Sequence, residues 1–196
     1  MRLSLRQRGL TLEYATLGWN VIGVIVMAIA AWHAGSIALA GFGLDSLIEI
    51  FASVVVIWQL MDNTRGREPL ALRLIGGAFF LLAVYLPVQA AVAWSSGARP
   101  APSQAGMIWL LATVVAMLLL AWGKLITGRA LGNPVLIAES RVTLIDAALA
   151  MAVLIGVGLN ALLGWWWSDP LAGLVIVGYA IAEGRAAWRG QRDVSG

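Results

Sequence analysis

Six long apolar runs constrain the fold of this chain more than any other feature of its sequence. A bilayer core about 30 Å thick requires roughly 20 apolar residues in each helix that crosses it. Runs of this length occur at 14–33, 37–60, 70–94, 105–125, 134–163 and 170–188. This pattern predicts an all-α integral membrane protein, a bundle of six transmembrane helices.

The composition agrees with a chain whose main solvent is lipid. Of its 196 residues 61% are hydrophobic and 12% are charged, and the mean hydropathy is +0.87. In soluble domains about a quarter of the residues are charged. The connectors between the runs are short, the longest being 95–104, so we expect a single domain over residues 1–196.

Basic residues flank the runs unevenly, which predicts how the helices are oriented. One side of the predicted bundle carries almost all of them: Arg2, Arg6, Arg8, Arg65, Arg67, Arg73, Lys124, Arg129, Arg185, Arg189 and Arg192. The other side has Arg99 alone. By the positive-inside rule both termini are expected in the cytoplasm, which an even number of spans also requires. The net charge of +3 then needs no nucleic-acid partner.

Acidic residues inside the predicted spans are the main pointer to function. Asp45 and Glu49 fall in the second run, and Glu139 and Asp146 fall in the fifth. Each acid near the middle of a bilayer costs about 2.5–3.5 kcal/mol on insertion scales, so its presence calls for a function. Asp45 and Glu49, four residues apart, share one helix face, and Glu139, Val142 and Asp146 share one stripe.

The depths of these carboxylates predict a cation site. Counting about 1.5 Å per residue along each helix, Asp45, Glu49 and Asp146 reach one depth, and Glu139 lies about 10 Å closer to the cytoplasm. Burial and like-charge repulsion both disfavour full ionisation, so a cation and protons would compete for the same oxygens. A midplane site that opens alternately to either side would exchange a divalent cation for protons.

Pairing with a buried base is the alternative explanation of these acids. Arg141 is the one basic residue that we consider close enough in sequence. It lies off the acidic stripe and is expected to extend towards the cytoplasmic interface. Asn20 and Ser53 could donate hydrogen bonds either across the bundle or to the acids, and the sequence leaves both roles open.

Two dipeptides are typical of helix starts. Asn133-Pro134 and Asp169-Pro170 each place a capping residue before a proline at the first helical position. We expect Asn133 and Asp169 to cap the helices that follow them. Each would then accept a hydrogen bond from its own first turn.

Three segments carry a resemblance to a known family. The segment 35–41, GSIALAG, leads into Asp45-Ser46 and Glu49. A second segment, GRALGNP at 128–134, leads into 138–140, AES. The third is Asp169-Pro170 before an apolar run. Together they resemble the cation diffusion facilitators, proton-coupled divalent-metal exporters with six transmembrane helices.

The resemblance implies roles for individual residues. Asp45 and Glu49 occupy two metal-ligand positions and Asp146 a third, while Val142 stands where the family normally has His or Asp. Glu139 is a candidate substitute for the missing ligand. A site of oxygen ligands without imidazole shifts the expected cargo from zinc towards manganese, iron or cobalt. No resident cofactor is expected, and zero cysteines exclude thiolate ligands.

Partners and location follow from the same resemblance. The expected partners are a divalent metal ion, protons and the lipid bilayer, and the expected location is a bacterial inner membrane. A homodimer formed through the glycine pair Gly76-Gly77 is a further hypothesis. Because the sequence stops at Gly196, we expect the cytoplasmic domain that usually follows the sixth helix of the family to be missing.

Functions from two classes remain open. One is a proton-coupled divalent-cation efflux transporter, and the other is a non-transporting membrane scaffold or subunit derived from one, for which Val142 is the argument. A third hypothesis is a proton-coupled exporter of organic cations, because a buried acid binds those as well. No nucleophile, base and oxyanion group come together in the sequence, so we expect no enzymatic activity.

Overall fold

The computed structural model describes residues 4–61, 68–97 and 99–194, and its regular structure there is helical throughout. The helices, in chain order, are α1 (Leu5–Ala34), α2 (Ile37–Met61), α3 (Glu68–Ser96), α4 (Gln104–Leu131), α5 (Pro134–Leu163) and α6 (Ser168–Val194). Each of them contains one of the predicted apolar runs. The prediction of an all-α fold is confirmed for the described residues.

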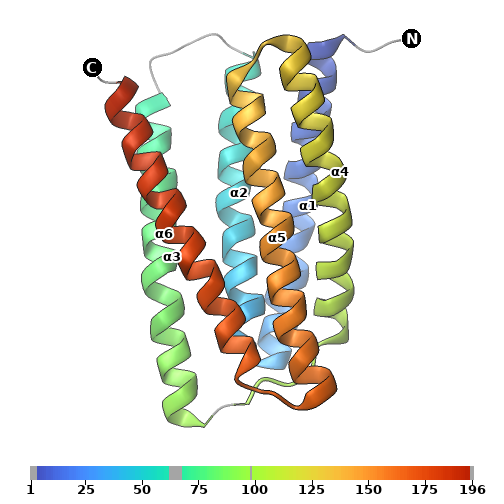
Figure 1. Ribbon diagram of the computed structural model, residues 1–196, viewed down its shortest axis with the longest axis vertical. Coiled ribbons are helices and arrows are strands. Elements are labelled where there is room, and N and C mark those ends of the chain that lie inside the picture. Colours follow the sequence, from blue (N-terminus) through green and yellow to red (C-terminus); the bar gives the residue numbers. More distant parts are fainter. Residues whose placement is uncertain (1–3, 62–67, 98, 195–196) are drawn as a thin grey trace.

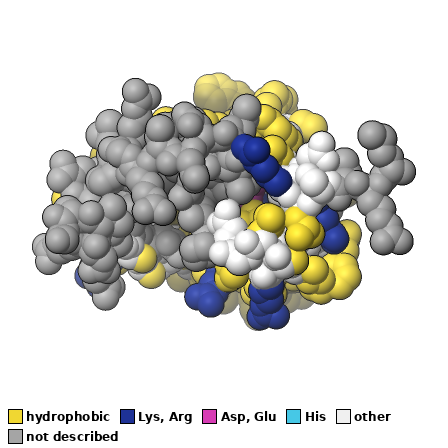
Figure 2. Space-filling model, turned by 90° about the horizontal axis from the view of Figure 1, so that it is seen from above, with side chains coloured by type: hydrophobic (Ala, Val, Ile, Leu, Met, Phe, Trp, Pro, Cys, Tyr) yellow, Lys and Arg dark blue, Asp and Glu magenta, His cyan; other side chains and the backbone are white. Residues whose placement is uncertain are grey.

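The helices lie side by side, and both ends of the chain lie at the same end of the bundle (Figure 1). We call this the terminal end. Arg6, Arg8 and Arg129 are exposed near it, and several basic side chains are visible among the described residues in the view from above (Figure 2). Which side of a membrane this end faces stays a prediction from the charge pattern.

Helices α1, α2, α4 and α5 form a group that encloses part of the bundle interior. Helix α1 packs on α2 and α4, while α5 packs on α4 and α2. Helices α3 and α6 pair with each other and join the group through α2 and α5 (Figure 1). The α5–α6 contact is close at Gly156, where an added Cβ would lie 2.4 Å from the Cβ of Ala172. Apolar side chains fill the centre, including Met27, Phe42, Leu86, Leu110, Val153 and Ile176.

Apolar side chains also cover the outside, as expected for a surface in contact with lipid. Ile25 and Ile29 on α1 are each 57% exposed, and Leu162 on α5 is 85% exposed. Within the described residues, three helical segments are long and apolar enough to cross a membrane: α1, α4 and Glu139–Leu163 of α5. That the remaining helices also cross the membrane stays a prediction.

Two of the interhelical turns are built alike. Gly35 ends α1 and Gly132 ends α4, each in the left-handed conformation with φ near 60° (61° and 62°), which costs glycine little. The next residue begins the following helix. Ser36 Oγ accepts from the Leu39 amide at 3.1 Å, and Asn133 Oδ1 accepts from the Leu136 amide at 3.1 Å. Asn133 therefore caps α5, as predicted.

Asp169 does not cap its own helix, and that prediction is wrong. Its carboxylate instead reaches the start of α2, where it accepts hydrogen bonds from the amides of Ile37 at 3.1 Å and Ala38 at 3.3 Å. It also accepts one from Ser36 Oγ. The first amides of α2 and its dipole attract a carboxylate strongly, and packing of α6 on α2 brings Asp169 within reach. Asp169 thus links α6 to α2.

Removing this link should destabilise the bundle. Asp169→Ala leaves buried donors at the start of α2 without an acceptor, so we expect a loss of about 1–3 kcal/mol in the free energy of unfolding. Asp169→Asn keeps one acceptor oxygen and should lose clearly less. Denaturant unfolding in detergent micelles, followed by circular dichroism, measures both variants. Equal losses in the two variants would contradict the proposed cap.

Candidate cation pathway

The interior of the α1, α2, α4 and α5 group contains a set of buried polar side chains. They come from all four helices, and each is at most 5% exposed. Because polar groups inside a membrane bundle are costly, a connected set of them marks a candidate pathway for ions or protons. We call this set the polar column: Glu13, Asn20, Asp45, Glu49, Lys124, Glu139, Thr143 and Asp146.

The middle of the polar column is acidic. The Asp146 carboxylate is 2% exposed, and neither of its oxygens has a hydrogen-bond partner among the described residues. Glu49 and Asp45 of α2 lie near enough to interact with it electrostatically. A buried carboxylate without a hydrogen-bond donor is a strong acceptor for a cation or a proton.

Glu49 is the better supported of the two acids on α2. Its Oε2 accepts a hydrogen bond from Asn20 Nδ2 at 2.8 Å, while its Oε1 has no partner among the described residues. Of the two roles that the sequence left open for Asn20, the structure therefore shows a hydrogen bond to one of the acids. Ser53, one turn further along α2, is fully buried, and its hydroxyl has no partner in the described part of the chain.

Lys124 ties the column together towards the terminal end. Its ammonium lies 3.2 Å from Glu13 Oε2 and 3.4 Å from Glu139 Oε1, and it donates to Thr143 Oγ1 at 3.0 Å. The side chain belongs to α4 and is fully buried within the bundle. Lysine seldom occurs in such a place unless it is paired, so the two carboxylates fix its position.

Two expectations about bases are corrected by this arrangement. Arg141 is exposed, as expected, but it is not the one base near the acids, because Lys124 pairs with Glu139 from the neighbouring helix. Lys124 does not belong to the basic residues at the interface, since it lies within α4 and is fully buried. Glu139 is thus a paired carboxylate in this structure, and its predicted metal ligation stays a prediction.

Glu13 is not among the site residues that the sequence predicts, because the first apolar run begins only at residue 14. A capping box extends α1 to Leu5: Ser4 Oγ accepts from the Gln7 amide at 3.2 Å, and Gln7 Oε1 accepts from the Ser4 amide at 2.9 Å. Glu13 therefore lies in the helix. The offsets of three and seven residues to Thr16 and Asn20 place all three on one face, a signal that the sequence did contain.

The predicted ligands do not form an assembled metal site in this structure. Among the described residues, no three His, Cys, Asp or Glu side chains lie close enough together to hold a metal ion. Val142 is half-buried, one turn before Asp146 on α5. Asp45, Glu49 and Asp146 are neighbours on two helices rather than a preassembled set of ligands.

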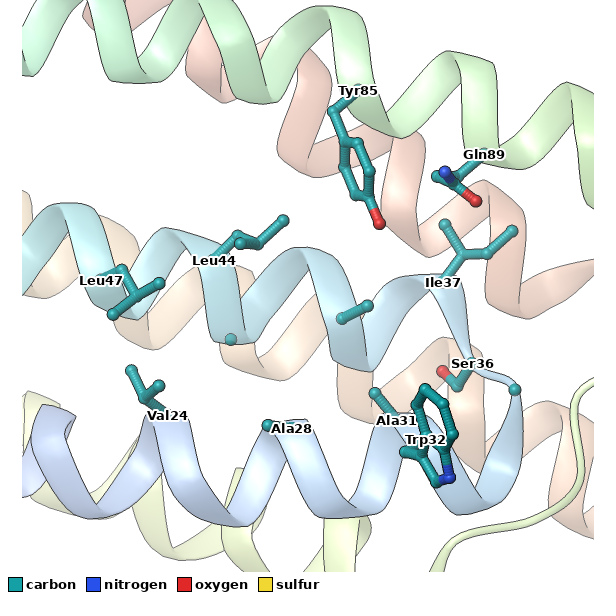
Figure 3. Close-up of a pocket in the computed structure, with 13 residues that line it drawn as sticks. Val24, Ala28, Ala31, Trp32, Ser36, Ile37, Leu44, Leu47, Tyr85 and Gln89 are labelled. Carbon is teal, nitrogen blue, oxygen red and sulfur yellow. The ribbon is translucent and has the colours of Figure 1, made fainter.

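A cavity of about 450 Å³ lies between α1, α2 and α3, from the turn between α1 and α2 towards the middle of these helices (Figure 3). Residues of all three helices line it, and Tyr85 and Gln89 of α3 extend towards α2. None of the described residues that line it is charged. This cavity is separate from the polar column, because no member of the column lines it.

Comparison with known families identifies the chain. Residues 67–189, more than half of the chain, match the model of the cation efflux transmembrane domain. The chain belongs to the cation efflux family. None of the curated proteins compared with it matches.

The family match gives the polar column its context. A cation efflux domain is a transporter domain, and together with its apolar helices it makes this chain an integral membrane protein related to cation transporters. The matched part includes Lys124, Glu139 and Asp146, whereas Asp45, Glu49 and Glu13 lie before it. The resemblance noted in the sequence is confirmed at the level of the family.

The buried charges around Lys124 should show a graded effect on stability. In metal-free buffer, Lys124→Gln leaves Glu13 and Glu139 without a counter-ion and should cost about 3–5 kcal/mol. Glu13→Gln should cost less, because Glu139 and Thr143 still hold the ammonium. Unfolding in detergent micelles compares the two. A Lys124→Gln variant as stable as Glu13→Gln would mean that the ion pairs contribute little.

Proposed function

We propose that this protein is a proton-coupled divalent-cation efflux transporter whose cargo binds at Asp45, Glu49 and Asp146. The observation that carries the proposal is the Asp146 carboxylate, which is buried beside two further acids and has no hydrogen-bond donor on either oxygen among the described residues. The family match supports cation transport as the class of function.

The chemistry of the carboxylates supports coupling to protons. Three neighbouring acids in a low-dielectric interior cannot all stay ionised without a counter-charge, so either a cation or protons must neutralise them. A cargo ion that leaves is then replaced by protons, and protons that leave make room for cargo. Alternate opening of the site to the two sides of the membrane converts this competition into exchange.

Binding requires the ligands to converge, because they are not assembled in this structure. A small shift of α5 relative to α2 would bring Asp146, Asp45 and Glu49 around one ion. Oxygen ligands alone suit manganese, iron or cobalt better than zinc, which prefers nitrogen and sulfur. We place the protein in a bacterial inner membrane, with the terminal end in the cytoplasm.

Transport in liposomes tests the proposal. With a proton gradient across the membrane, the wild-type protein should move at least one of manganese, iron, cobalt and zinc, and Asp146→Asn should reduce the flux at least tenfold because it removes the charge that attracts the cargo. Asp169→Asn, which lies outside the carboxylate site, is the matched control. No flux of any of the four metals under either gradient direction would favour the scaffold alternative.

Val142→His tests where the cargo sits on α5. An imidazole placed one turn before Asp146 adds a nitrogen ligand, so zinc flux should rise relative to manganese flux. Val142→Leu serves as the control for side-chain size. An unchanged metal preference in the histidine variant, with wild-type manganese flux, would place the cargo away from residue 142.

A further inference from the structure

The ammonium of Lys124 occupies a position that resembles a cation site more than an ordinary surface ion pair. Three oxygens surround it at 3.0–3.4 Å, from Glu13 on α1 and from Glu139 and Thr143 on α5. The Thr143 hydroxyl donates its proton to the Glu139 carbonyl at 3.0 Å, which leaves its lone pairs directed at the ammonium. All four side chains are buried.

The oxygens around Lys124 have capacity that one ammonium does not use. Glu13 is fully buried, and its Oε2 pairs with the Lys124 ammonium, whereas its Oε1 has no partner among the described residues and can bind a second positive charge. The Thr127 hydroxyl, one turn from Lys124 on α4, is buried and has no partner in the described part of the chain. Two carboxylates with nearby hydroxyls are the hard oxygen ligands that divalent cations take.

The location of these oxygens makes them part of the cargo's route. Glu13, Lys124 and Glu139 each lie within eight residues of the terminal end of their helix, whereas Glu49 and Asp146 lie twelve residues from it. Glu49 interacts electrostatically with Glu139, Lys124 and Glu13, so the two parts of the column share one field. An ion that travels between Asp146 and the terminal end passes Lys124.

We propose that Glu13, Glu139 and Thr143 form a second cation site, in which the Lys124 ammonium is a tethered resident cation that a divalent cargo ion displaces on its passage. The proposal rests on the proposed function for the nature of the cargo. Lysine suits this role because its ammonium is a compact charge on a flexible four-carbon stem and can withdraw while the cargo passes. With Lys124 in place, the second site holds no metal at rest.

Metal-binding stoichiometry tests this site independently of transport. Purified protein in detergent is equilibrated with Mn²⁺, and bound manganese per chain is measured by dialysis and elemental analysis. Lys124→Gln should bind one ion more than the wild type, because it empties the second site. Lys124→Arg, which keeps the charge, should bind as many ions as the wild type. In Glu13→Gln/Lys124→Gln the additional ion should be lost.

Manganese should also replace the missing ammonium as a stabilising charge. The melting temperature of Lys124→Gln should rise with added Mn²⁺, and that of Glu13→Gln/Lys124→Gln should not, because a ligand that binds only the folded state stabilises it. A folded Lys124→Gln with wild-type stoichiometry would overturn the proposal. Aggregation of Lys124→Gln even in saturating Mn²⁺ would overturn it as well.

The design separates this proposal from the proposed function. Asp146→Asn in the wild-type background removes the ion at the first site, while the additional ion in Lys124→Gln depends on Glu13. If Asp146→Asn leaves manganese binding unchanged and Lys124→Gln still gains a Glu13-dependent ion, the first site is wrong and the second stands. If Asp146→Asn loses the ion that the wild type binds and Lys124→Gln gains none, the proposal of the second site alone is wrong.

Discussion

The neutralisation of buried negative charge is the constraint on which the rest of this molecule depends. Five carboxylates, of Glu13, Asp45, Glu49, Glu139 and Asp146, share the interior of four helices with one ammonium. Fully ionised, they would leave a formal surplus of four negative charges in a medium of low dielectric constant, which no bundle of apolar helices tolerates without cations or protons. Lys124, the one buried base among the described residues, lies towards the terminal end of the column and pairs with two of these carboxylates. Glu49 and Asp146 have no buried base paired with them among the described residues, so exchangeable cations or protons must neutralise them.

Much of the fold and part of the column could be predicted from the sequence, because both depend on local spacing. Length and hydropathy located each helix that the structure describes, and the four-residue interval from Asp45 to Glu49 placed two acids on one face of α2. The common depth of these acids and Asp146 is a prediction from helical rise alone, and in the structure Glu49 and Asp45 interact electrostatically with Asp146. Asn133 caps α5 because a cap of this kind is formed within its own turn.

What the sequence did not yield depends on contacts between helices that are distant in the chain. Lys124 near the end of an apolar run is compatible with an interfacial lysine, and only the packing of α4 on α1 and α5 turns it into a buried partner of Glu13 and Glu139. Asp169 has the local pattern of a helix cap, yet its carboxylate finds stronger donors at the start of α2. The partners of both Lys124 and Asp169 lie on other helices, so local sequence patterns do not reveal them.

Simultaneous recording of metal and proton movement tests this account most directly. Liposomes that contain the protein and a pH-sensitive dye receive an external pulse of manganese, and uptake is followed together with internal pH. We predict that manganese entry is accompanied by proton movement in the opposite direction, and that Asp146→Asn abolishes both signals. Manganese movement without any change in internal pH, or undiminished exchange in Asp146→Asn, would contradict the claim that buried carboxylates exchange cargo for protons.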